Sequence, residues 1–210
     1  MEKINIELIE ENYRPLVMML LSQLKNHSEE TFVHSVDVAK KSLLLAESLG
    51  IRKGYLQRLY TAGLLHDIGK LFIDKEILHS RNATDNEKEI IRLGHIVGTK
   101  TILSDYFGTE IVRLAAHHHE RLNSSGYPEH LNAEKLDVLD RILQVADVTS
   151  ALIMNRSYKE AYEADEVIAI LDSLVTKGEL DKKCVSEIEK IFLIPLKDKF
   201  QIKEKSQRGS

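Results

Sequence analysis

The stretch Leu64-Leu65-His66-Asp67-Ile68-Gly69-Lys70 decides how the rest of the chain is interpreted. It follows an apolar stripe with helical spacing, formed by Leu56, Leu59, Tyr60 and Leu64. This stripe predicts a helix that carries His66 and Asp67 into the interior, where an unpaired carboxylate is costly. A His-Asp dipeptide can occur by chance, but a carboxylate can bridge two metal ions while the neighbouring imidazole binds one. Our working hypothesis is therefore a metal-dependent phosphohydrolase.

Composition narrows the class of protein. The 210 residues carry a net charge of −4, which does not suggest a protein that binds a nucleic-acid backbone. The single cysteine, Cys184, excludes an intramolecular disulfide and a cysteine zinc cluster. The N-terminus lacks the order of a signal peptide, and no apolar run approaches the ~20 residues of a membrane span. We expect a soluble, cytoplasmic protein.

Helical periodicity dominates the sequence and predicts an all-α fold, a single helical bundle with a metal centre in its core. A capping box at Thr84-Asp85-Asn86-Glu87 starts one helix, and the segment 74–83 before it is expected to be a loop. Helices are expected at 16–24, 29–49, 111–116, 136–154, 164–175 and 181–192, besides those around 56–65 and after 84. We divide the chain into an N-terminal helical extension (1–28), the main domain (29–196) and a polar tail (197–210).

Further candidate ligands occur on other predicted helices. Glu30 and His34 are four residues apart and share a helix face, although for an isolated pair a solvent-facing glutamate beside a satisfied histidine is the commoner explanation. Asp147 lies on the apolar face of its helix and needs a buried partner. Arg141 is one candidate for this partner, and a metal ion is the other.

Histidines contribute most of the remaining candidates. His118 and His119 lie at a helix end, but the neighbouring His117 shows that a chance cluster is an alternative. His95 lies between Gly94 and Gly98, which suggests a close backbone approach there. His27, His79 and His130 lie in polar surroundings and are assigned to the surface. A ligand set rich in nitrogen and free of sulfur favours iron, manganese, zinc or cobalt over calcium or magnesium.

In their order and spacing these motifs resemble the HD-GYP subgroup of HD-domain phosphohydrolases. The resemblance runs from about Thr31 to Val175 and rests on six short segments: Glu30/His34, His66-Asp67-Ile68-Gly69-Lys70, His95-x-x-Gly98, His118-His119-Glu120-Arg121, Gly126-Tyr127-Pro128 and Val145-Ala146-Asp147. A further segment, Asn155 to Lys159, is similar to that family's Arg-Pro-Tyr-Arg/Lys. The resemblance implies a helical phosphodiesterase whose two or three iron or manganese ions hydrolyse cyclic di-GMP to pGpG or GMP through a metal-bridging hydroxide.

The resemblance also implies roles for individual residues. The implied metal ligands are His34, His66, Asp67, His95, His118, His119 and Asp147, with Asp67 bridging and with Glu30 as support for a third ion. Lys70 is implied to meet the scissile phosphate, where its cation would neutralise developing charge; a solvated lysine at a helix end is the alternative. Arg156, Lys159 and Tyr127 are implied to contact the nucleotide, although the first two could be surface charges and Gly-Tyr-Pro is also ordinary turn chemistry.

The chain departs from the family pattern around the expected substrate loop. Asn123 and Ser124 stand where the family usually has Asp-Gly, so a charge and a permissive backbone are lost. Ser150 stands where an aspartate often follows the last metal ligand, and Asp74-Lys75 replaces the usual Pro-Asp. None of these positions is an implied metal ligand. We expect the metal centre to be retained and the base preference or rate to differ.

Two rival functions are kept. One is an HD phosphohydrolase that acts on another cyclic dinucleotide or on a nucleotide. The other is a non-catalytic signalling module that binds cyclic di-GMP or a diguanylate cyclase. The expected partners are cyclic di-GMP and, as further candidates, a diguanylate cyclase or another signalling protein and a second copy of the chain. We expect neither a nucleic-acid polymer nor a membrane as a partner.

Overall fold

Helices account for most of residues 4–80, 82–154 and 161–196, the parts of the chain that the computed structural model describes. These parts contain no β-strand, and one isolated β-bridge joins Asn123 to Asn132. The all-α prediction is confirmed. The helices are α1 (Arg14–His27), α2 (Glu29–Ser48), α3 (Lys53–Leu65), α4 (Lys75–Leu78), α5 (Asp85–Leu103), α6 (Thr109–His117), α7 (Val138–Ile153), α8 (Ala164–Thr176) and α9 (Lys182–Ile188). Short helical turns are η1 (Ile6–Leu8), η2 (Glu11–Tyr13), η3 (Ile68–Phe72) and η4 (Glu189–Leu193).

Local capping explains where several helices begin and end. Ser28 starts α2 by accepting a hydrogen bond from the Thr31 amide, and Gly50, with φ +73°, follows its end. The predicted capping box at the start of α5 is present, because Thr84 and Glu87 each bond to the other's backbone amide. The boundaries of these helices are therefore set largely by the residues next to their ends.

The prediction of a loop over 74–83 is wrong in part. Residues Lys75–Leu78 form the single-turn helix α4, which Asp74 caps by accepting a hydrogen bond from the Glu76 amide at 2.7 Å. At the other end of the chain, the helix expected over 181–192 is α9 followed by the π-helical turn η4.

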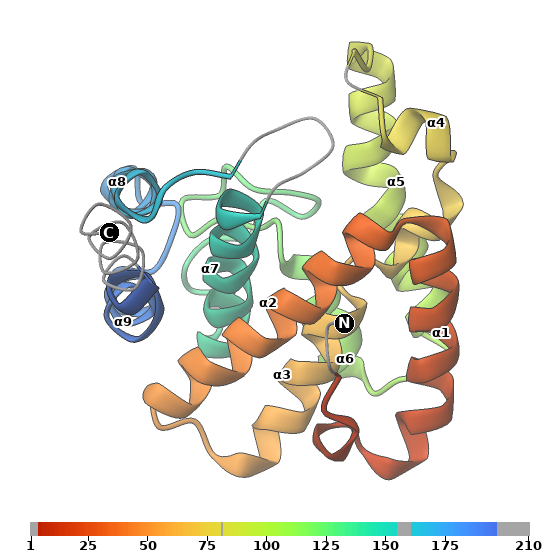
Figure 1. Ribbon diagram of the computed structural model, residues 1–210, viewed down its shortest axis with the longest axis horizontal. Helices are drawn as coiled ribbons and strands as arrows, with labels where there is room; N and C mark the ends of the chain where they lie inside the picture. Colours follow the sequence, from red (N-terminus) through yellow and green to blue (C-terminus); the bar gives the residue numbers. More distant parts are fainter. Residues whose placement is uncertain (1–3, 81, 155–160, 197–210) are drawn as a thin grey trace, which may run out of the picture.

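The packing of the helices places the core around α2. Helix α2 runs against α1, α3 and α7, while α6 packs on α3 and α5 packs on η3 (Figure 1). In Figure 1, α1 lies on one side of the molecule and α8 and α9 lie on the other, beyond α7, whereas α5 projects away from the body. Leucines such as Leu59, Leu64 and Leu143 are fully buried between these helices. The C-terminal ends of α3 and α6, the first half of α2 and the middles of α5 and α7 face one interior region.

Within the described residues, each helix is too short or too polar to cross a lipid bilayer.

Candidate metal centre

Seven side chains from five parts of the fold meet in the core. α2 supplies His34, the junction of α3 and η3 supplies His66 and Asp67, and α5 supplies His95. The end of α6 supplies His118 and His119, and α7 supplies Asp147. The side chain of His119 is 24% exposed, whereas those of the other six are no more than 8% exposed. The seven ligands implied by the motifs are thus brought together.

The carboxylate of Asp67 lies between two sets of histidines. Its Oδ2 is 3.3 Å from Nε2 of His66 and 4.0 Å from Nε2 of His34. Its Oδ1 is 3.9 Å from Nε2 of His95 and 4.0 Å from Nε2 of His118. Each oxygen therefore faces a different pair of imidazoles, which is the geometry that a bridging carboxylate needs.

Asp147 faces the same centre from α7. Its Oδ1 is 3.0 Å from Nε2 of His34 and 3.8 Å from Nε2 of His66, and its Oδ2 is 3.8 Å from Nδ1 of His119. The alternative partner considered for Asp147 is wrong. The guanidinium of Arg141 instead pairs with Asp181, with 2.9 Å between Nη1 and Oδ2.

Several donor atoms of the cluster lack a protein partner. In three of the histidines, Nδ1 bonds to a carbonyl oxygen of the preceding turn: His66 to Gly63, His95 to Ile91 and His118 to Ala115. Nδ1 therefore carries the proton, and Nε2 offers a lone pair to the interior. These three Nε2 atoms and Oδ1 of Asp67 are buried and, within the described residues, have no hydrogen-bond partner. Buried polar atoms are normally satisfied, so this set fits a cation that is bound between them.

The donor atoms fall into two groups of the size that a metal ion needs. His34, His66 and Asp67 form one group, and His95, His118 and His119 form the other, with the donor atoms of each lying within 4.8 Å of one another. Nitrogen-rich sets of this kind suit first-row transition ions. The residues present therefore fit two divalent ions with Asp67 between them.

Burial and mutual repulsion keep most of these histidines neutral. Burial lowers the pKa of His118 well below its usual value, and the neighbouring His119 and His66 add to the effect. Burial likewise lowers the pKa of His119 to about 3. For Asp67, burial alone would raise the pKa, but Lys70 and His66 outweigh it and hold the pKa well below the ordinary range. Neutral imidazoles beside an ionised carboxylate are the protonation states that bind metal ions.

Lys70 lies at the edge of this cluster. Its Nζ is 2.6 Å from Oδ2 of Asp67, and its side chain is 15% exposed. η3 places it one turn after Asp67. A cation in this position is directed at the metal centre and is not a freely solvated lysine.

Other predicted site residues stand outside the two groups. Glu30 is half-buried on α2 and belongs to neither ligand group. His117, which the sequence assigns no role, lies with Nδ1 3.6 Å from Oδ1 of Asp140 and takes no part in the centre. Arg156 and Lys159 lie outside the described residues. His79 and His130 are exposed, as expected, but His27 is half-buried and its Nε2 lies 2.9 Å from the carbonyl oxygen of Ile73.

Tyr127 packs its ring against His119 at the edge of the centre. The centroid of its ring lies 4.8 Å from that of His119, and the guanidinium of Arg92 lies over the same ring, 4.5 Å from its centroid. Sequence reasoning missed Arg92. Its position three residues before His95 on one helix, and hence on nearly the same face, is the signal that could have found it.

The loop before Tyr127 is fixed by local contacts that account for its departures from the family pattern. The side-chain amide of Asn123 donates a hydrogen bond to the carbonyl of Lys177 at 2.9 Å, which an aspartate could not do. Ser124 has φ +65°, the left-handed conformation that glycine adopts easily. The buried carboxylate of Glu120 accepts hydrogen bonds from the amides of Glu129 and Leu131. The loop is thus tied to α8 on one side and to Glu120 on the other.

Comparison with known proteins places this geometry in context. A protein-family model described as "HD domain" matches residues 13–184. The chain is 34% identical over 174 residues to the 3'3'-cGAMP-specific phosphodiesterase 1 of Vibrio cholerae. The aligned region covers 82% of the chain and 40% of that protein. It is 34% identical over 156 residues to a cyclic di-GMP phosphodiesterase of Pseudomonas aeruginosa, covering 73% of the chain and 38% of that protein. The chain thus spans about two fifths of the length of these relatives.

Solved structures agree on the fold. An HDG"Y"P protein from Bdellovibrio bacteriovorus superimposes with a TM-score of 0.64 at 21% identity, over 84% of this chain and 60% of that one. The HD domain of the phosphodiesterase PgpH from L. monocytogenes, in complex with cyclic-di-AMP, gives a TM-score of 0.62 at 16% identity, over 85% and 95% of the two chains.

Proposed function

The chain belongs to the HD domain family, in its HD-GYP type, and from this membership and the two ligand groups we propose that it is a metal-dependent cyclic dinucleotide phosphodiesterase. The proposed substrate is cyclic di-GMP, and the proposed products are pGpG, GMP or both. Two relatives that are 34% identical to the chain over the aligned residues are named phosphodiesterases of cyclic dinucleotides.

The position of Asp67 is the observation that carries the proposal. Hydrogen bonding explains only one oxygen of this carboxylate. Oδ2 contacts Lys70, whereas Oδ1 faces His95 and His118 and has no hydrogen-bond partner in the described residues. Two ions shared through such a carboxylate are the arrangement that in-line displacement at phosphorus uses.

The proposed cofactor is a pair of divalent ions, iron or manganese. His34, His66 and Asp67 would hold one, and His95, His118 and His119 the other, with Asp147 facing His34, His66 and His119. When bound, such a pair supplies Lewis acidity towards a phosphoryl oxygen and lowers the pKa of a water molecule between the ions. Glu30 as support for a third ion stays a prediction.

The chain's own residues would handle the rest of the phosphodiester. Lys70 lies beside Asp67, where its ammonium group would neutralise charge that develops on the phosphoryl oxygens. The Arg92 guanidinium, which lies against the Tyr127 ring, offers charged hydrogen-bond donors to a nucleobase or to the second phosphate, and Tyr127 is proposed to line the same pocket. Arg156 and Lys159 are proposed to add contacts to the same nucleotide.

The test combines metal analysis with turnover. Protein purified without oxygen is expected to hold two ions per chain and to convert cyclic di-GMP to a linear product that chromatography identifies. Asp67→Ala is expected to lose both ions and at least 10³-fold in kcat/KM, about 4 kcal/mol of transition-state stabilisation. Asp105→Ala, at an exposed aspartate after α5, is the matched control. Full metal loading without turnover of any cyclic dinucleotide would refute the enzyme proposal, and equal activity in Asp67→Ala would refute the site.

A second candidate substrate is 3'3'-cGAMP, since a relative at 34% identity is named as specific for it. The Asn123-Ser124 loop beside Tyr127 gives a physical reason for a changed base preference. Assaying both dinucleotides with the same loaded protein distinguishes the two by their kcat/KM ratio. A non-catalytic module would bind them without turnover. A cytoplasmic location, a diguanylate cyclase partner and a homodimer remain predictions.

A further inference from the structure

We infer that Ser150 and Asp37 are positioning residues for His34, forming a hydroxyl–carboxylate relay from α7 back to α2. The inference rests on the proposed metal centre, because it concerns how one of its ligands is oriented. Neither residue belongs to the ligand groups.

The relay is a continuous chain of hydrogen bonds. Nδ1 of His34 lies 3.0 Å from Oγ of Ser150, and that hydroxyl donates to Oδ2 of Asp37 at 2.6 Å. Because the single hydroxyl proton goes to the carboxylate, the hydroxyl oxygen accepts the proton of His34 Nδ1–H. In the metal-bound protein this tautomer would leave the lone pair on Nε2, the atom that lies 3.0 Å from Oδ1 of Asp147 and 4.0 Å from Oδ2 of Asp67.

His34 differs in this respect from the other buried histidines. His66, His95 and His118 direct Nδ1 at carbonyl oxygens three or four residues earlier in the chain. Their ring orientation is therefore set by local backbone. His34 contacts a side chain 116 residues away, so its orientation depends on how α2 and α7 pack.

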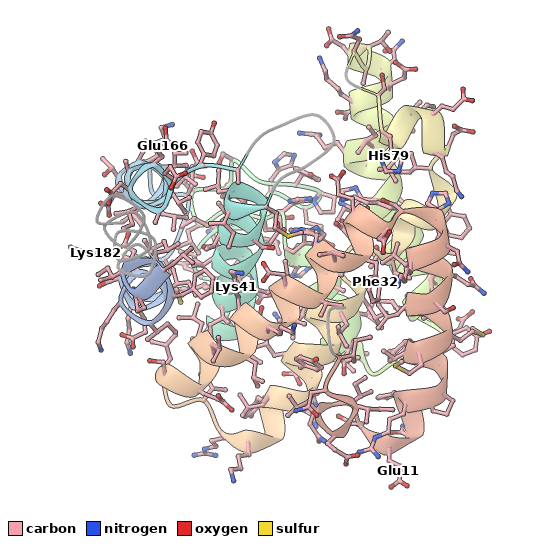
Figure 2. The ribbon with its side chains drawn as sticks, viewed as in Figure 1. Glu11, Phe32, Lys41, His79, Glu166 and Lys182 are labelled. Atoms are coloured by element: carbon pink, nitrogen blue, oxygen red, sulfur yellow. The ribbon has the colours of Figure 1, made fainter. Side chains whose placement is uncertain are left out.

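A buried lysine holds the far end of the relay. Nζ of Lys41 lies 2.5 Å from Oδ2 of Asp37, the same oxygen that Ser150 contacts. The Lys41 side chain is only 2% exposed, lies where α2 passes α7 (Figure 2), and its ammonium also lies 4.3 Å from the centroid of the Phe192 ring. A cation buried this far must be paired, and the contact with Lys41 fixes the position of the Asp37 side chain.

The relay should matter for one ion more than for the other. His34 belongs to the group with His66 and Asp67, whereas the group with His95, His118 and His119 has no contact with Ser150 among those described. Removing an outer hydrogen-bond partner of a metal-binding histidine typically weakens metal binding about 10–100-fold. We therefore expect Ser150→Ala to weaken one of two binding steps by that factor.

The experiment is a titration of metal-free protein with Co²⁺, in which binding is measured by calorimetry and by the visible absorption of the bound ion. Ser150→Ala is compared with wild type, with Ser150→Thr, which restores the hydroxyl, and with Thr149→Val. Thr149 is the adjacent buried residue, and among the described residues its hydroxyl donates a hydrogen bond within its own helix, to the carbonyl of Val145. Asp37 is left unchanged because its loss would strand the Lys41 ammonium.

A 10–100-fold weaker single step in Ser150→Ala, with recovery in Ser150→Thr and no change in Thr149→Val, supports the relay. Unchanged affinity for both ions, equal weakening of both, or the same loss in Thr149→Val overturns it. If the wild type binds no Co²⁺, the proposed metal centre fails together with the relay. That result is distinct, because it appears in the wild-type titration.

Discussion

Ser124 adopts a left-handed backbone conformation that glycine adopts more easily. Its φ of +65° lies in the left-handed region, where a side chain with a Cβ is disfavoured by roughly 1–2 kcal/mol. It keeps this conformation because the residues on both sides of it are held by hydrogen bonds. The side-chain amide of Asn123 donates to the carbonyl of Lys177, and the amide of Ser125 donates to Oδ1 of Asn123. The strain is local and should be removable.

Ser124→Gly is therefore expected to stabilise the protein. Glycine relieves the left-handed strain but gains conformational freedom in the unfolded chain, so the net gain in the free energy of unfolding should be about 0.5–1 kcal/mol. Urea denaturation of both proteins measures the difference. Ser125→Gly is the control, because φ of Ser125 is not positive, and it should be neutral or destabilising. Ser124→Gly with the lower urea midpoint would contradict the strain argument.

At the scale of elements, η3 and α5 approach so closely that two glycines face each other. A Cβ on Gly69 would lie 1.9 Å from the carbonyl oxygen of His95 and 2.3 Å from the amide nitrogen of Thr99. A Cβ on Gly98 would lie 2.8 Å from the carbonyl oxygen of Gly69. The predicted close approach near His95 is thus present at Gly98, while Gly94 has ordinary contacts. This approach sets Asp67 beside His95.

Gly69→Ala should separate the two elements, because backbone atoms cannot yield as a side chain does. We expect a loss of roughly 2–4 kcal/mol in the free energy of unfolding, comparable with other severe packing errors. Thermal and urea unfolding measure it, with metal content as a second readout, since Asp67 and His95 move apart. A Cβ on Gly54, in the first turn of α3, meets nothing within 4 Å. Gly54→Ala should be neutral or stabilising, and equal effects of the two substitutions would argue against the packing explanation.

Most helices could be predicted because each carries its own signals. The α5 capping box and the apolar stripe of α3 are local, and both elements formed as expected. Helix α4 was missed because four residues are too few to show a period, and only its Asp74 cap marks it. Likewise, Arg141 and Asp147 lie on the same helix, but their different partners depend on where α9 and α2 pack.

At the scale of the molecule, the sequence could predict which side chains would meet but not how they would face one another. The motifs indicate a cluster around Asp67, and helix packing brings those residues together. Which oxygen of Asp67 faces which histidines depends on the relative placement of α2, α5 and α6, and no local pattern records it. Arg92 and the Ser150–Asp37 relay were missed for the same reason.

The buried cluster should make the stability of the whole metal-free protein depend on pH. The pKa values of His95, His118 and His119 are lowered by burial, to about 3 for His119, whereas unfolded histidines titrate near 6.5. As the pH falls below 6.5, the unfolded chain takes up protons that the folded chain cannot, so stability falls. His66 acts in the opposite direction. Burial alone would lower its pKa, but Asp67 and Asp147 raise it, so its stabilisation is present at low pH.

More of these histidines have a lowered pKa than a raised one. The free energy of unfolding of the metal-free protein should therefore fall by about 1.4–2.7 kcal/mol per pH unit between pH 6 and 5, which corresponds to the uptake of one or two protons on unfolding. Bound Mn²⁺ should add stability at pH 7, by ~2.7 kcal/mol for each ion present at 100 times its dissociation constant. It should also steepen the slope, because His66 must then give up its proton as well. Urea midpoints across pH 5–8, with and without Mn²⁺, measure both effects. His118→Gln removes one histidine whose pKa is lowered, so the stability of the metal-free variant should depend less steeply on pH. A wild-type stability profile that is flat from pH 7 to 5 would contradict the assignment of neutral buried histidines.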